Sequence, residues 1–297
     1  MLPRASGSGP WAAIFDQGVI ERPICGILAG RDEYVRLTEL QSNGARASSR
    51  GPSNENILAD RCLLSRTPFS PDAELRFRSL RFSLQGYEEW LGLRSIKVAV
   101  GRRSLTARYV RSHQYKWKLS LGKLSLEFDL RHPIQGSWSK ISLTELPHLR
   151  ISVNQQVDLH KTLDLARRIE DLITLLTDSD RGLNFPYLEA IGHSSPIKIY
   201  YTRLEHPQEE VVQHKCWTWF PNISGNFGSI MEKWFSKHEF FGPGFHLYLG
   251  SRRRTQLYPE HRFASLVWGL ESLHRRVSSA GESTALDEKI KRILSRD

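Results

Sequence analysis

The spacing of the hydrophobic side chains changes once along the chain, and this change most constrains the fold. Between residues 105 and 130 apolar and polar residues alternate, the period-two pattern of half-buried β-strands. Between residues 159 and 176 apolar residues recur every three or four positions, which is typical of an amphipathic helix. The sequence therefore predicts an α+β protein: a mostly antiparallel, β-sandwich or barrel-like N-terminal domain with packed helices, followed by a partial C-terminal helical segment.

Local signals refine this pattern in the first half of the chain. Short strands within residues 20–38 are expected to turn near Gly30, and residues 41–56, rich in Ser, Gly and Asn, are expected to form a surface loop. In residues 75–84 the apolar set changes from odd to even positions, which predicts a β-bulge near Arg78 and Ser79. Residues 87–91 are expected to form one helical turn that ends at Gly92.

The second half predicts helices separated by short strands. Helices are expected at residues 158–177, 226–238, 261–277 and 283–294, strands at residues 197–201 and 211–220, and a short apolar run at residues 245–249. These elements suggest three parts: a flexible N-terminus (residues 1–19), a β-rich domain (residues 20–257) and a helical segment (residues 258–297).

Composition excludes several classes of protein. A hydrophobic content of 39% with eight Trp is enough for a core, so wholesale disorder is not expected. No window reaches the ~20 apolar residues of a membrane span, and the first ten residues lack the apolar run of a secretory signal. The three cysteines form no C-x-x-C pair, so neither a disulfide framework nor a zinc ribbon is predicted. We expect a cytoplasmic protein without a cofactor or metal.

The net charge of +10 is concentrated in one place. Residues 1–150 hold 23 basic and 14 acidic side chains, and residues 94–123 alone hold nine basic and none acidic. This basic segment predicts contact with RNA, another nucleic acid or an acidic protein partner. The candidate contact residues are Arg102, Arg103, Arg108, Arg111, Lys116 and Lys118. Tyr109, Tyr115 and Trp117 have the opposite parity and are expected to pack in the core.

Motifs for catalysis are weak. The phosphate-binding glycine loops, the H-E-x-x-H pair and the G-x-S-x-G elbow are absent from the sequence. Two Arg…His spacings, Arg108 with His113 and Arg254 with His261, resemble a metal-independent ribonuclease pair, but the abundance of Arg and His produces such spacings by chance. We therefore predict no catalytic residue in this chain; a complete hydrolase with a site assembled from distant residues is the remaining enzymatic alternative.

Three passages together resemble a known family. They are ICGIL at residues 24–28, LRF at 75–77 leading to YEEWLG at 87–92, and IMEKWF at 230–235 followed by RFASLVWGLESLHRR at 262–276. Their order and spacing resemble the ApeA-type bacterial phage-defence proteins, which have a β-rich N-terminal domain followed by a helical HEPN domain. The resemblance covers about residues 20–276.

The resemblance implies abortive infection, in which the N-terminal domain senses or restrains and the HEPN domain cleaves RNA at an R-x4–6-H motif. No such motif follows on a late helix here, so a truncated or split member is expected, with no catalysis of its own. Glu271 and Arg275 match polar positions of the first HEPN helix, where they could support a site or form a surface ion pair. The implied partners are a HEPN-containing chain, a second copy, RNA or a phage component, and not a membrane. The alternative function is a nucleic-acid-binding module that acts through residues 94–123.

Overall fold

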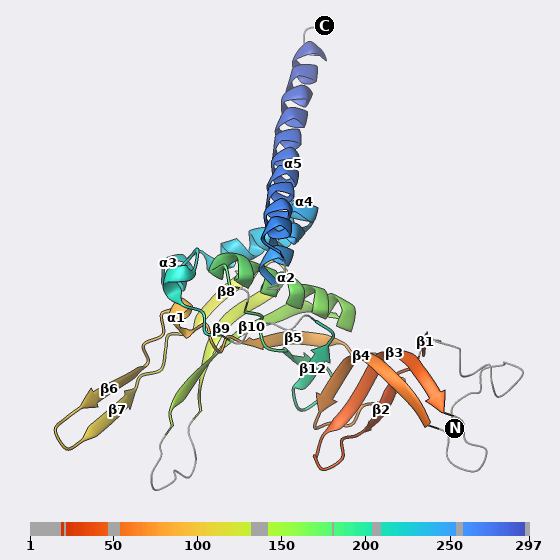
Figure 1. Ribbon diagram of the computed structural model, residues 1–297, viewed down its shortest axis with the longest axis vertical. Coiled ribbons are helices and arrows are strands. Elements are labelled where there is room, and N and C mark those ends of the chain that lie inside the picture. Colours follow the sequence, from red (N-terminus) through yellow and green to blue (C-terminus); the bar gives the residue numbers. More distant parts are fainter. Residues whose placement is uncertain are drawn as a thin grey trace, which may run out of the picture. The chain divides into compact units, whose positions relative to one another are not determined.

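The computed structural model describes residues 19–20, 22–46, 54–131, 142–179, 181–203, 209–253 and 258–294 (Figure 1). The chain divides into two compact units, each built from several segments. The first comprises residues 1–81, 155–159 and 185–203, and the second comprises residues 82–154, 160–184 and 204–297. Mostly antiparallel strands combine with helices, so the predicted α+β class is confirmed. The described strands form an open sheet and not a closed barrel.

The first unit is a twisted antiparallel sheet with one buried face. Its strands are β1 (Val19–Ile20), β2 (Ile24–Ile27), β3 (Tyr34–Arg46), β4 (Asn54–Ser65), β5 (Phe77–Ser83), β11 (Tyr187–Ala190) and β12 (Ile197–Tyr201), in the order β1-β3-β4-β12-β11-β5, with β2 also paired to β3. Leu63, Leu188, Ile197 and Ile199 alternate onto one face and are completely buried.

The predicted bulge in β5 is confirmed. Ser79 lies opposite Glu189 and Phe77 lies opposite Ala190, so Arg78 is the extra residue. Phe77 and Leu80 are therefore both buried despite their different parity. The loop predicted at residues 41–56 is too long, because β3 continues to residue 46 and β4 begins at residue 54. Residues 47–53 lie outside the described part of the chain, as do residues 1–18 of the predicted flexible N-terminus.

The second unit contains a three-stranded antiparallel sheet, a separate ribbon and most of the helices. The sheet has the order β10 (Thr144–Val157), β9 (Gly122–Arg131) and β8 (Tyr115–Leu119), and the ribbon pairs β6 (Ile96–Val100) with β7 (Leu105–Tyr109). The helices are α1 (Glu88–Leu91), α2 (Leu159–Thr177), α3 (Phe220–Ile223), α4 (Phe227–Arg253) and α5 (Pro259–Leu294). The predicted end of α1 at Gly92 and the extent of α2 are confirmed; Gly92 has φ 67°.

Other helix predictions need correction. Residues 211–220 do not form a strand: a 3-10 turn (Gln213–Lys215) leads to α3, with Pro221 in the first helical turn. The helix predicted at residues 226–238 continues to Arg253 and includes the apolar run at residues 245–249, although Gly242 interrupts it with φ 50°. The two predicted C-terminal helices are one helix, α5. The division near residue 257 stays a prediction.

Candidate functional site

The basic segment is divided between two hairpins, the β6–β7 ribbon and the β8–β9 pair. Strand β7 ends at Tyr109 and β8 begins at Tyr115. Arg108 therefore belongs to the ribbon, whereas Lys116 and Lys118 belong to the larger sheet (Figure 1). The six candidate contact residues are all exposed, but they do not share one strand face.

Like charges face each other in both hairpins. In the ribbon Lys97 lies directly opposite Arg108, and in the sheet Lys118 lies directly opposite Lys123. Directly opposed like charges destabilise an antiparallel pair. Arg102 and Arg103 lie in the turn of the ribbon.

A buried carboxylate anchors the end of the ribbon that joins the sheet. Glu145 is 6% exposed and accepts hydrogen bonds from the Tyr109 hydroxyl at 2.9 Å, the Ser112 amide at 3.1 Å and the Ser112 hydroxyl at 2.8 Å. Burial and the contact with Glu145 raise the pKa of Tyr109, so the phenol keeps its donor proton. Arg111 donates to the Phe128 carbonyl at 3.0 Å. One predicted contact residue, Arg111, thus helps to attach the ribbon.

Tyr115 and Trp117, the aromatic residues of β8, are half-buried and pack against other rings on the side that their parity predicted. The Tyr115 and Trp117 rings stack at 5.6 Å between centroids, and both contact Phe220 edge-on. The Trp117 indole donates to the Ser224 carbonyl at 3.0 Å, and Trp117 also packs on Phe227. These rings fix β8 against α3 and α4, so they are not stacking platforms for bases.

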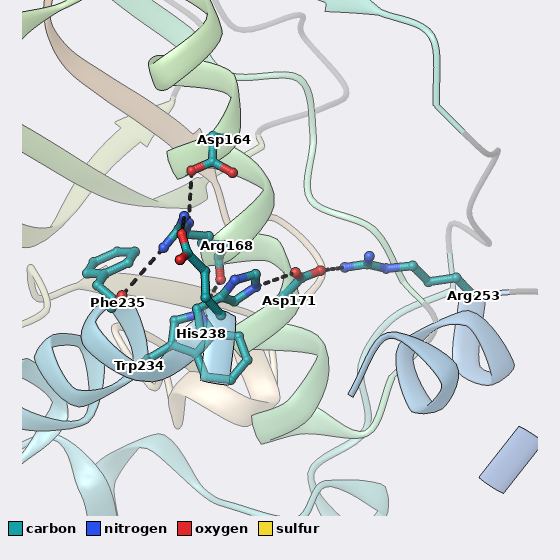
Figure 2. A network of polar contacts seen from close by, with 8 residues as sticks. Asp164, Arg168, Asp171, Trp234, Phe235, His238 and Arg253 are labelled. Carbon is teal, nitrogen blue, oxygen red and sulfur yellow. Dashed lines mark hydrogen bonds and ion pairs between the residues drawn. The ribbon is translucent and has the colours of Figure 1, made fainter. Parts of the chain in front are cut away.

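A polar network joins α2 to α4 (Figure 2). Asp171, whose side chain is 7% exposed, lies 3.1 Å from Nε2 of His238 and 2.6 Å from a guanidinium nitrogen of Arg253. The Trp234 indole donates to the Arg168 carbonyl at 2.7 Å. Sequence analysis missed this network because its members lie 67 and 82 residues from Asp171 and no local motif connects them.

Asp178, the residue that directly follows α2, holds the end of α4. Asp178 accepts a hydrogen bond from the Tyr248 hydroxyl at 2.6 Å and pairs with Arg252. Burial and this hydrogen bond raise the pKa of Tyr248. A buried charge is tolerated when it is paired, and these contacts pair Asp178. They therefore attach α4 and do not indicate a reactive site.

Neither of the two Arg…His pairs with ribonuclease-like spacing forms a site within the described residues. Arg108 lies in the ribbon, whereas the His113 ring packs edge-on against Tyr115 at 4.9 Å. His261 is exposed beside Tyr258, and its proposed partner Arg254 lies outside the described residues. Within the described ranges, no group of three or more His, Cys, Asp or Glu side chains could hold a metal ion. Burial raises the pKa of the thiols of Cys25, Cys62 and Cys216, which disfavours the reactive thiolate.

Glu271 and Arg275 form an ion pair at 2.6 Å on the exposed side of α5. Apolar side chains lie nearby on the same helix: Phe263, Val267, Leu270 and Val277 are 70%, 43%, 68% and 63% exposed. Their spacing of four, three and seven residues is that of a helix–helix seam. The other side of α5 packs against α4, where a Cβ at Gly269 would lie 2.8 Å from the Gly244 carbonyl oxygen.

The described residues form an open antiparallel sheet with attached helices and a basic ribbon. Residues 16–234 match the family model described as ApeA N-terminal domain 1. The chain therefore belongs to the ApeA N-terminal domain family, which connects it with phage defence by abortive infection. Neither the curated proteins nor the solved structures include a match. No described helix is long and apolar enough to cross a membrane.

Proposed function

We propose that this chain is the non-catalytic sensing or regulatory part of a bacterial anti-phage system in which a HEPN domain cleaves RNA. Membership of the ApeA N-terminal domain family is the observation that carries the proposal. The domain match ends at residue 234, within α4, and α5 follows it. In this proposal α4 and α5 transmit the state of the N-terminal domain to the ribonuclease.

The exposed seam of α5 supports a helical partner for this step. The seam consists of the exposed apolar residues Phe263, Val267 and Leu270. Their spacing would let a second helix pack along them and cover them. A HEPN-containing chain would cover the seam with one of its own helices. The Glu271–Arg275 pair beside the seam would then act as a surface ion pair and not as a catalytic element.

Paired substitutions on α5 test this proposal. Val267→Ser with Leu270→Ser removes the seam, whereas Glu271→Ser with Arg275→Ser removes only the ion pair. We expect the first double variant to abolish both protection against phage and association with the ribonuclease partner, and the second to leave both intact. If the second double variant abolishes both effects and the first does not, the Glu271–Arg275 pair binds the partner and the apolar seam does not.

RNA cleavage tests the absence of catalysis. Purified chain is expected to leave RNA intact, and cleavage is expected only when the HEPN-encoding reading frame of the same genomic locus is expressed with it. Cleavage by the purified chain that is lost in His261→Ala or His113→Ala would support the complete-hydrolase alternative and overturn this assignment.

A second candidate function is nucleic-acid binding through residues 94–123. The directly opposed pairs Lys97/Arg108 and Lys118/Lys123 favour it, because phosphates would neutralise both. Titration of RNA and DNA at rising salt tests it. Affinity is expected to fall steeply with salt and with Arg108, Lys116 and Lys118 changed to Glu; affinity unaffected by either change would exclude this function.

A further inference from the structure

The β6–β7 ribbon has two chemically different faces. The cross-strand pairs Ile96/Tyr109, Val98/Ala107 and Val100/Leu105 lie on one face, and Lys97/Arg108 and Ala99/Thr106 lie on the other. The apolar face is exposed: Val98 is 58% exposed, Val100 79% and Leu105 67%. Exposure is greatest at the pair beside the turn that carries Arg102 and Arg103.

Folding alone does not explain this apolar face. A two-stranded ribbon is at best marginally stable in water, and apolar side chains that stay exposed add little to its stability. The ribbon is nevertheless held at its base by Glu145, which accepts three hydrogen bonds from Tyr109 and Ser112. An anchored base and a solvent-exposed tip of mixed apolar and basic character are the properties of a binding arm.

Charge and size together limit what binds the arm. Residues 94–123 contain nine basic and no acidic side chains, so the segment attracts anionic ligands and repels cationic ones. A second copy would bring the same cations to the interface. Five residues per strand span about 17 Å, and a ribbon about 10 Å wide would bury only about 350 Å² between two copies. Stable protein–protein interfaces bury about 1,000 Å² or more, so the arm cannot hold a second copy alone.

We propose that the ribbon inserts its tip into the minor groove of double-stranded DNA. Arg102 and Arg103 lie in the groove against the phosphates, and Val100 with Leu105 forms an apolar wedge that partly separates two base pairs. The narrow minor groove of B-form DNA attracts arginine, and minor-groove proteins combine basic residues with apolar wedges in this way. The shallow, wide minor groove of RNA duplexes gives such a wedge less contact. The proposal rests on the nucleic-acid-binding function above and names its ligand.

Fluorescence anisotropy with four probes of equal length tests the proposal: a DNA duplex, the same duplex with a central mismatch, single-stranded DNA and an RNA duplex. A wedge must unstack a base step, and a mismatch lowers that cost. We therefore expect the mismatched duplex to bind at least about tenfold more tightly than the intact one. Single-stranded DNA and duplex RNA are expected to bind more weakly than either.

Three double variants separate the parts of the arm. Val100→Thr with Leu105→Thr keeps strand-forming side chains but removes the wedge, and it is expected to abolish the mismatch preference. Arg102→Gln with Arg103→Gln is expected to weaken binding to every duplex and to reduce the salt slope by about two. Lys116→Gln with Lys118→Gln removes the same charge from β8 and is the matched control; it is expected to keep the mismatch preference. Circular dichroism verifies that each variant is folded.

Each outcome decides between the two proposals. Equal affinity for intact and mismatched duplex, or a preference that survives the threonine variant, overturns groove insertion and leaves nucleic-acid binding standing. No binding to any probe at low salt overturns both. Binding of the arm to vesicles of anionic phospholipid or to polyglutamate, with no binding to DNA, would assign the ribbon to a membrane or to an acidic protein and also contradict the proposal.

Discussion

Replacing Asp171 by alanine is expected to destabilise the second unit by about 3 kcal/mol. The Asp171 side chain is 7% exposed and is the shared partner of His238 and Arg253, whose side chains are 11% and 22% exposed. Removing one member of a buried ion pair costs about 3–5 kcal/mol, because the other charge stays buried without a partner. Partial access of water to Arg253 places the cost at the lower end, about 3 kcal/mol.

Asp164→Ala is the matched control on the same helix. The Asp164 side chain is 47% exposed and pairs with Arg168 four residues later, an arrangement worth about 0.5 kcal/mol or less. Both substitutions replace Asp by Ala inside α2, so the gain in helix propensity cancels when the two are compared. The difference between the variants therefore isolates the network of Asp171.

Urea unfolding followed by Trp fluorescence measures this difference. Seven of the eight Trp residues lie in the second unit, and Trp234 belongs to the network itself, so the signal reports on the correct part of the chain. A loss of about 3 kcal/mol corresponds to a fall in Tm of about 6–12 °C for a unit of this size. If the two variants agree within about 0.5 kcal/mol, the network does not attach α4 and the reasoning is wrong.

Three further predictions follow from the structure. Gly92→Ala is expected to lower stability by about 1–3 kcal/mol in thermal unfolding, since φ is positive and the new Cβ would lie 2.8 Å from a Pro221 atom; Gly225→Ala, which meets nothing within 4 Å, is the control and is expected to change stability by less than about 0.5 kcal/mol. Burial lowers the pKa of His193, so the unfolded chain takes up this proton more readily than the folded one. The stability gained from keeping His193 neutral is therefore present above the usual pKa of histidine and is lost as pH falls through the lowered pKa. His193→Asn should therefore lose less Tm than wild type between about pH 7.5 and about pH 5; an equal loss in both would contradict this. Glu145→Gln is expected to speed hydrogen exchange in the ribbon and not in β9, whereas uniform acceleration would mean general unfolding.

Residue patterns within single elements were enough to predict the bulge in β5, the end of α1 and the extent of α2. The change of parity in β5 located the bulge at Arg78, because side-chain alternation cannot skip a residue without an insertion. Gly92 ended α1, and the three-to-four spacing gave the extent of α2. The parity of Tyr115 and Trp117 correctly placed both rings on the packed side of β8, where they are half-buried.

Features that depend on distant partners were missed. Apolar residues occupy odd positions in both residues 105–109 and residues 115–119, so the shared parity did not reveal that the chain leaves one ribbon and enters another sheet. The helix predicted at residues 226–238 was too short, because α4 resumes after the break at Gly242 and continues to Arg253. At the break Arg276 of α5 donates to the Phe240 carbonyl at 3.0 Å, which satisfies a group that the break leaves free.

The pairing of Asp171 with His238 and Arg253 had no sequence signal either. Each residue alone is an ordinary polar position of an amphipathic helix, and only the packing of α4 on α2 buries the carboxylate. The exposed Glu271–Arg275 pair, by contrast, follows from the i, i+4 spacing and agrees with the ion-pair interpretation.

Phage plating tests the assignment to phage defence most directly. Matched host cells would carry either the native locus of this chain or the same locus with the chain deleted in frame, and the number of plaques would be counted for a panel of phages. The account predicts that deletion restores plaque formation for at least one phage that the native locus restricts. If every phage in a broad panel plates equally on both strains, the chain does not act in phage defence.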